Sequence, residues 1–157
     1  MNSSKSETEA TLKTLGSYGV KAAAFQANLT TEASVEKWFS SHVPLIVWAA
    51  ADITPDRLFS DAAAALGVSK FDITINTVGK VLKKPIVETT EQEFDDMFLV
   101  NSKWAFFFIK HAAKNLNEGG TIISLVTSLL GAFAPGYSTY QGSKAPIEWF
   151  TKSAAKE

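Results

Sequence analysis

Apolar and polar positions alternate along the chain in blocks that predict helices and strands in turn. Residues 7–15 have the composition of a helix that Gly16 would end, and residues 20–26 form a run of small and apolar residues typical of a short strand. The clearest strand is at 71–76 (FDITIN), after a helical stretch that Gly67 closes. The first half of the chain therefore predicts the order helix, strand, helix, strand.

The second half continues the same alternation. Thr90 and Glu93 have the spacing of a capping box, which predicts the start of a long helix that runs as far as 117–120, where two glycines would stop it. Residues 121–127 form a buried strand, and a last helix is predicted from about Thr139 onward. This alternation favours the α/β class, with a doubly wound parallel sheet and crossover helices.

Residues 38–57 do not fit this order. Their apolar run at 43–48 divides what would otherwise be one amphipathic helix, because removal of the segment brings Val35, Leu58 and Phe59 to i, i+3, i+4 spacing. The segment is in frame, and codons that form a splice donor and acceptor can be written at its two ends. It is therefore either a retained short intron or a genuine insertion loop, and the sequence leaves both open.

Composition and charge exclude several classes of function. The formal net charge is −1 and the longest basic cluster is Lys83 and Lys84, so nucleic acid is not an expected partner. Absence of cysteine excludes disulfides and thiol chemistry, and His42 and His111 lie too far apart in sequence to suggest a metal site. The longest apolar stretch, 43–51, is too short to cross a membrane, and we expect a cytoplasmic protein.

Three residues near the end of the chain carry the clearest chemistry. Tyr140 and Lys144 are i and i+4 on the predicted last helix, so the phenol and the ammonium share a face and the cation favours the phenolate form. Ser128, at the end of the strand before, can donate a hydrogen bond to a substrate oxygen. A Tyr-x-x-x-Lys pair alone is more typical of an exposed helical pair than of a catalytic site, so the surrounding residues decide.

Two other positions change that picture. Asn101 lies on the apolar stripe of the long helix, where it is either satisfied by local backbone or marks a helix bend that holds a water near an active site. Asn76 and Gly79 directly follow a strand, where a doubly wound fold places its ligand crevice, although a simple strand-ending turn explains them equally well.

Together these motifs resemble the short-chain dehydrogenase/reductase family. Ser128, Tyr140 and Lys144 match its catalytic serine and Tyr-x-x-x-Lys, Asn101 matches the asparagine that completes its tetrad, and residues 76–79 (NTVG) match its Asn-Asn-Ala-Gly turn. The resemblance implies a Rossmann-like fold and hydride transfer between a nicotinamide cofactor and the carbon of a small-molecule carbonyl or secondary alcohol.

The resemblance also assigns a role to each residue. Tyr140 would be the general acid or base, and Lys144 would support it and hold the nicotinamide ribose. Ser128 would orient the carbonyl, with the neighbouring Thr127 as the fallback hydroxyl, and Asn101 would position a proton-relay water. The implied cofactor-binding residues are Asn28, Asn76, Gly79, Tyr140 and Lys144. NADP(H) is expected rather than NAD(H), because residues 2–5 are polar with one cation and no acid, which suits a 2′-phosphate.

One family motif is absent from the sequence, the Thr-Gly-x-x-x-Gly-x-Gly loop that holds the pyrophosphate. We therefore expect residues 1–157 to form a partial domain, truncated at both ends, whose sheet lacks the first two strands and the C-terminal strands. The alternative to an enzyme is a catalytically inactive fragment that acts at most as an association module. The helical region 91–116 is the expected surface for a homo-oligomer.

Overall fold

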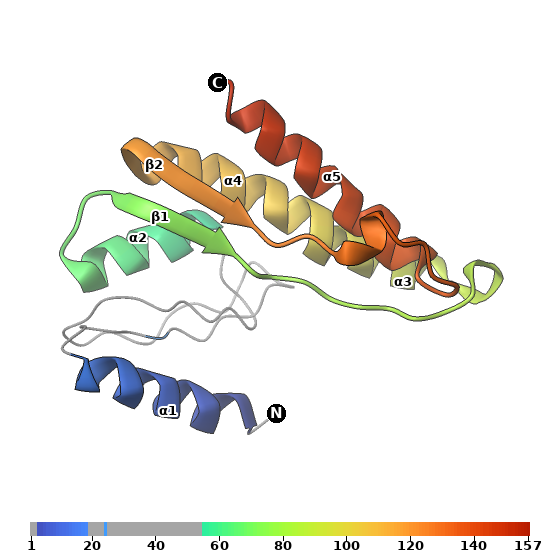
Figure 1. Ribbon diagram of the computed structural model, residues 1–157, viewed down its shortest axis with the longest axis horizontal. Helices are drawn as coiled ribbons and strands as arrows, with labels where there is room; N and C mark the ends of the chain where they lie inside the picture. The colour runs from blue at the N-terminus through green and yellow to red at the C-terminus, as the bar shows by residue number, and fades with distance from the viewer. Residues whose placement is uncertain (1–2, 19–23, 25–54) are drawn as a thin grey trace. The chain divides into compact units, whose positions relative to one another are not determined.

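The computed structural model describes residues 3–18, 24 and 55–157 and divides into two compact units, 1–70 and 71–157 (Figure 1). In the first unit the described helices are α1 (Ser3–Ser17) and α2 (Pro55–Leu66). They confirm the two helices predicted there, although α1 begins at Ser3 rather than at residue 7. Residues 55–57 form the first turn of α2. The predicted strand at 20–26, apart from residue 24, and Asn28 and residues 38–54 lie outside the described residues.

The second unit contains a parallel β-sheet, as the alternation of elements predicts. Its described strands, β1 (Phe71–Asn76) and β2 (Leu116–Ser124), pair in parallel, with Thr74 opposite Ile122 and Asn76 opposite Ser124. The connection between them is helical, which a parallel pair requires. On β1 the buried Thr74 and Asn76 alternate with the exposed Ile73 and Ile75, because successive side chains of a strand point to opposite faces. One face of this part of the strand is therefore buried, and the isoleucines of the other face are exposed.

The end of the long helix was predicted wrongly. The helix ends at Asn115, and Gly119 and Gly120 lie inside β2, where the pairing shifts register between Phe71 and Ile73. Gly119 has a φ of 77°, and a Cβ on Gly120 would lie 2.9 Å from the carbonyl oxygen of Asn117. The two glycines therefore permit a β-bulge, a feature that also favours glycine, instead of stopping a helix.

The predicted long helix is three segments in line: α3 (Glu91–Phe98), a π-helical turn η2 (Leu99–Lys103) and α4 (Trp104–Asn115). The capping box is present, because the Thr90 side chain accepts from the Glu93 backbone N–H while the Glu93 carboxylate accepts from the Thr90 backbone N–H. The π turn contains Asn101, at the position where the sequence suggests a helix bend. The last helix, α5 (Ser138–Ala154), continues through Pro146.

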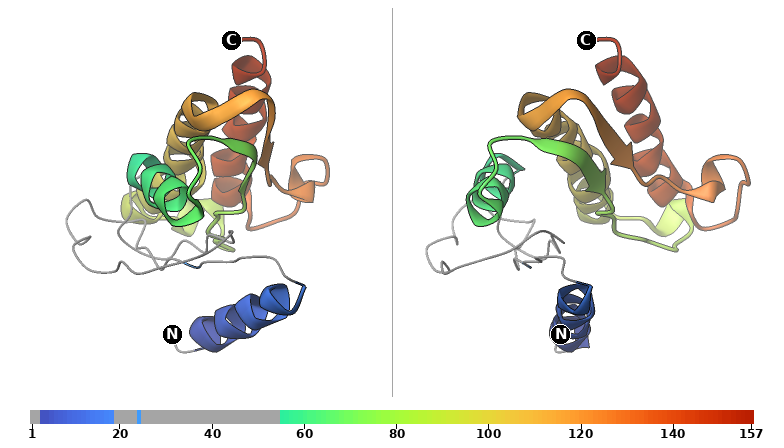
Figure 2. Two further views of the ribbon diagram at one scale, coloured as in Figure 1. Left: turned by 90° about the vertical axis from the view of Figure 1, so that its left-hand side faces the viewer. Right: turned by 60° about the vertical axis from the view of Figure 1, so that its left-hand side comes forward.

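The core of this unit lies where α4 and α5 pack against each other and against the strands (Figure 2). It consists of side chains on α3 and α4 together with one each from β1 and α5. These are Phe71, Met97, Trp104, Ala105, Phe108, Ile109, Ala112 and Ile147. Two short 3-10 turns, η1 (Ile86–Glu88) and η3 (Ser128–Leu130), lie in the segments that follow β1 and β2. Among the described helices none is both long and apolar enough to span a bilayer.

Candidate active site

The predicted site residues of this unit gather where β1 and β2 end. Both strands run toward the end of the sheet at which the segments after them and the start of α5 also lie (Figure 1, Figure 2). Asn76 is the last residue of β1 and Gly79 follows it, Ser128 follows β2, and Lys144 comes from α5. The carboxyl ends of parallel strands are where α/β folds place their ligands.

Lys144 is the centre of this arrangement. Its side chain is buried, and its ammonium donates to the carbonyl oxygens of Val78, at 3.0 Å, and Leu125, at 3.2 Å. One carbonyl follows β1 and the other follows β2, so a single cation ties together the ends of both strands. Burial lowers the pKa of the Lys144 ammonium below its usual value.

Gly79 provides the space that this ammonium needs. A Cβ at residue 79 would lie 2.7 Å from the Lys144 Nζ and 3.0 Å from its Cε, closer than side-chain carbons come to other atoms. The sequence suggested that this glycine allows close approach of a cofactor. The structure gives it a different neighbour, because the atom that comes close is the Lys144 Nζ.

Asn76 shapes the turn that carries the Val78 carbonyl. Its buried Oδ1 accepts a hydrogen bond from the Val78 backbone N–H at 3.1 Å, which is an Asx turn. Its backbone carbonyl accepts from the Leu125 N–H at 2.9 Å, extending the strand pairing by one bond. Asn76 therefore positions both segments that Lys144 contacts.

Asn101 is fully buried, and both amide hydrogens of its side chain are used. Its Nδ2 donates to the Lys80 carbonyl at 2.9 Å and to the Ser143 Oγ at 2.8 Å, while its Oδ1 accepts from the Lys80 backbone N–H at 2.8 Å. The sequence suggested satisfaction by local backbone, whereas the backbone partner is Lys80, 21 residues earlier in the chain, and the π turn is present as well. Asn101 joins the helical connection, the segment after β1 and α5.

Two serines at this junction were not predicted as site residues. The Ser143 Oγ donates to the Tyr140 carbonyl at 2.9 Å while accepting from Asn101, and the Ser102 Oγ donates to the Ser143 carbonyl at 2.6 Å. Ser143 is fully buried. The sequence contains one indication that Ser143 is buried. It lies four residues before the apolar Ile147, which places its hydroxyl on the inward face of α5. These contacts fix the turn of α5 that carries Tyr140 and Lys144.

Neither Tyr140 nor Ser128 is buried. Tyr140 is partly exposed, Ser128 is exposed, and no hydrogen bond is recorded between either hydroxyl and the described part of the chain. The Gln141 Nε2 donates to the Leu129 carbonyl, which holds η3 against α5. Thr127, the fallback hydroxyl, instead caps η3 by accepting from the Leu129 N–H at 3.2 Å. Of the pair, Ser128 is therefore the one whose hydroxyl takes no part in capping η3.

The segment after β1 is attached to α3 by two ion pairs. The Lys80 ammonium lies 3.0 Å from an Asp96 carboxylate oxygen, and the Lys84 ammonium lies 2.9 Å from the Glu93 carboxylate. The Thr90 backbone hydrogen bond and the Lys84 ammonium lower the pKa of Glu93 to about 2. The pKa of Asp96 is lowered by the side-chain hydrogen bonds from Lys80 and Gln92. This segment therefore has fixed attachments on both sides of Lys83.

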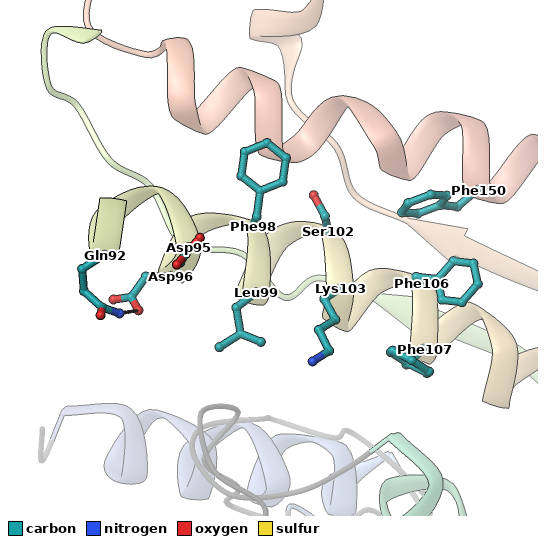
Figure 3. A pocket seen from close by; sticks show the side chains of 10 residues that line it. All are labelled: Gln92, Asp95, Asp96, Phe98, Leu99, Ser102, Lys103, Phe106, Phe107 and Phe150. Atoms are coloured by element: carbon teal, nitrogen blue, oxygen red, sulfur yellow. Dashed lines mark hydrogen bonds between the residues drawn. The ribbon is translucent and has the colours of Figure 1, made fainter. Parts of the chain in front are cut away.

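A groove of about 560 Å³ runs along α3, η2 and α4, with one residue from α5 (Figure 3). None of the four predicted catalytic residues lines it. The lining residues are Gln92, Asp95, Asp96, Phe98, Leu99, Ser102, Lys103, Phe106, Phe107 and Phe150. Phe106 is 46% exposed and packs edge-on against Phe150, with ring centroids 5.2 Å apart.

Comparison with known proteins gives a consistent family assignment. A family model described as enoyl-(acyl carrier protein) reductase matches residues 9–157. A short-chain dehydrogenase/reductase from Pestalotiopsis microspora is 42% identical over 100 residues, which covers 63% of this chain and 37% of that protein. A hydroxynaphthalene reductase-like protein from Metarhizium brunneum is 37% identical over 112 residues, 67% of this chain and 40% of that protein.

Solved structures agree with these relatives. A protein from Burkholderia cenocepacia, described as a dehydrogenase with bound NADP, is 47% identical with a TM-score of 0.79 over 99% of this chain and 51% of that one. An angucycline C-6 ketoreductase with bound NADP is 26% identical with a TM-score of 0.61, covering 73% of this chain and 49% of that one. The chain thus spans about half or less of the length of these relatives. It belongs to the short-chain dehydrogenase/reductase family of oxidoreductases.

Proposed function

We propose that this chain carries the catalytic residues of an NADP(H)-dependent oxidoreductase that interconverts a small-molecule carbonyl and the corresponding secondary alcohol. The observation that carries the proposal is the buried Lys144 ammonium, held at the carboxyl end of the sheet one helical turn from Tyr140. An ammonium buried at a ligand-binding edge, next to an accessible phenol, suits proton transfer.

The residues at this edge fit the nicotinamide end of such a cofactor. Lys144 has three N–H donors, of which two are used by the Val78 and Leu125 carbonyls, so one donor remains for a ribose hydroxyl. When bound, the cofactor supplies a hydride to the carbonyl carbon or accepts one from the alcohol carbon. The preference for NADP(H) is supported by the relatives whose structures contain NADP. Asn28 and residue 2 lie outside the described residues, and their roles stay predictions.

Tyr140 and Ser128 act on the substrate oxygen in this proposal. In reduction the Tyr140 hydroxyl gives its proton to that oxygen, and in oxidation the phenolate takes it back. The Lys144 cation favours the phenolate that remains, because opposite charges attract. The Ser128 hydroxyl donates a hydrogen bond to the same oxygen, and its lack of any recorded internal partner leaves it free to do so.

Asn101 has a narrower role than the family resemblance implied. Both of its side-chain N–H groups are already bonded, so a relay water would have to bind an oxygen of this residue, either Oδ1 or the backbone carbonyl. A π turn leaves backbone carbonyls without their usual helical donors, which supports the second choice. We therefore propose that Asn101 positions a water by an oxygen atom and not by its amide hydrogens.

The test is NADPH binding and ketone reduction by the purified chain, with Tyr140→Phe as the matched variant. We expect micromolar NADPH binding by calorimetry in both proteins, and NADPH oxidation with an aromatic ketone in the wild type alone. Phenylalanine keeps the ring and removes only the hydroxyl, which has no recorded internal partner. Equal turnover by the two proteins would refute the role of Tyr140, and absence of NADPH binding would favour the inactive association module.

The groove along α3 and α4 supports a second proposal, that copies of the chain associate through residues 91–116. Phe106 and Leu99 line the groove and are exposed, and burial of large apolar side chains such as these at an interface is favourable. Sedimentation of Phe106→Asp should show a smaller species than the wild type at equal concentration. Val87→Asp is the control, because Val87 is 90% exposed and lies on η1 outside the groove. An unchanged sedimentation profile for Phe106→Asp would exclude this surface.

A further inference from the structure

Lys83 differs from the two other lysines of its segment. Lys80 and Lys84 are each paired with a carboxylate of α3, at 3.0 and 2.9 Å. The Lys83 ammonium lies instead over the ring of Tyr137, 5.6 Å from its centroid. This distance is within the range of a cation–π contact, which leaves the positive charge largely uncompensated. No carboxylate partner for Lys83 is recorded within the part of the chain that the structure describes.

The same contact brings Lys83 close to the proposed general acid. The Tyr137 and Tyr140 rings meet edge-on with centroids 6.2 Å apart, so steps of 5.6 and 6.2 Å connect the ammonium to the Tyr140 ring. The backbone around Lys83 is fixed, because the Lys84 N–H donates to the Gly136 carbonyl at 2.7 Å. Gly136 has a φ of 81°, which a side-chain-bearing residue adopts only with strain.

The ammonium of Lys83 lies against an aromatic ring. The Tyr137 ring is beneath it, and the segment between η3 and α5 that leads to Tyr137 also carries Phe133, whose side chain is 90% exposed. A ligand at this place would meet aromatic surface with one positive charge at its edge. Such a surface suits a flat apolar body that carries one anionic group.

We propose that Lys83 and Tyr137 make the entrance to the Tyr140 site selective for aromatic carbonyl compounds that carry an anionic group. The inference rests on the proposed oxidoreductase function and adds the charge class of its substrate. The anionic group would lie beside the Lys83 ammonium and the aromatic body against Tyr137. The carbonyl would extend toward the hydroxyls of Tyr140 and Ser128.

The test compares two ligands that differ only in charge, 4-acetylbenzoate and its methyl ester. Their dissociation constants are measured by NMR titration with excess NADPH, for the wild type, Lys83→Gln and Lys152→Gln. Lys152 is the control for loss of a surface charge elsewhere: its ammonium also lies over a ring, 5.1 Å from the Trp149 centroid, but on the last turns of α5 and paired with Glu148. We expect the wild type and Lys152→Gln to bind the carboxylate about fivefold more tightly than the ester. Lys83→Gln should lose this preference, and added salt should reduce it in the wild type.

Absence of a preference in the wild type, binding of neither ligand, or a preference that survives in Lys83→Gln would overturn the proposal. Turnover is scored separately, by NADPH oxidation with the same two ketones. A Lys83-dependent preference without turnover would refute the oxidoreductase function and keep the binding selectivity. Turnover of both ketones, with equal affinity for the carboxylate and the ester, would refute the binding selectivity and keep the oxidoreductase function.

Discussion

Substitution of Gly79 by alanine should show that the position of Lys144 depends on the absence of a side chain at residue 79. The added Cβ would lie 2.7 Å from the Lys144 Nζ, whereas ordinary contacts begin near 3.4 Å. One of the two atoms must therefore move by about 0.7 Å. The hydrogen bonds from Nζ are 3.0 and 3.2 Å long, so a shift of this size breaks at least one of them.

The expected cost follows from the charge on the donor. A hydrogen bond that involves a charged group contributes roughly 1.5–3 kcal/mol, so Gly79→Ala should lower the free energy of unfolding by about 2 kcal/mol. Urea denaturation followed by tryptophan fluorescence measures this change. Gly142→Ala is the matched control on α5, because the nearest atom to its Cβ is the Phe98 Cζ, 3.9 Å away. Alanine should be neutral there or stabilising by up to about 1 kcal/mol.

A double-mutant cycle identifies the cause of the loss. If the clash is with the lysine, Gly79→Ala should cost little in a Lys144→Ala background, with a coupling energy of about 2 kcal/mol between the two sites. The reasoning is refuted if Gly79→Ala is as stable as the wild type within about 0.5 kcal/mol, or if the two effects add.

Four further substitutions test separate parts of the site. Asn101→Ala should lower the free energy of unfolding by about 3 kcal/mol, because it breaks three hydrogen bonds of a buried side chain. Urea titration measures this change, and a loss below about 1 kcal/mol would contradict the reasoning. The carboxylate of Glu93 has a pKa near 2, below its usual 4.5, so its stabilising effect is present above pH 4.5 and is lost as the pH falls toward 2. Thermal melts of Glu93→Gln and wild type should therefore converge between pH 4.5 and 2, and a constant difference would exclude the linkage. Ser128→Ala should reduce ketone turnover at least tenfold and leave the free energy of unfolding unchanged. Thr127→Ala should lower the free energy of unfolding by about 1 kcal/mol, because it removes the cap of η3. The opposite result would exchange the roles of the two residues.

Much of the fold could be predicted because local signals agree with the packing. The capping box at Thr90 fixes the start of α3, and the alternation of elements correctly predicts a parallel pair of strands. The end of α4 was missed because glycines serve both helix ends and bulges, and only the register against β1 distinguishes these uses.

The site was less predictable, because its contacts join residues far apart in sequence. The residue types at Asn101 and Lys144 marked them as unusual, yet their partners are mostly backbone carbonyls, which leave no trace in a sequence. Ser143 and Gln141 act by holding neighbouring segments, and a helix contains many such residues with no special role.

The double attachment of Lys144 has a consequence for recognising active and inactive members of this family. A residue that ties the strand ends together is under selection for folding, whatever part it takes in the proposed reaction. Its presence in a sequence therefore reports an intact sheet edge and is weak support for turnover. The hydroxyls of Tyr140 and Ser128 have no such second task within the described chain, so they are the positions at which loss of catalysis would first become visible.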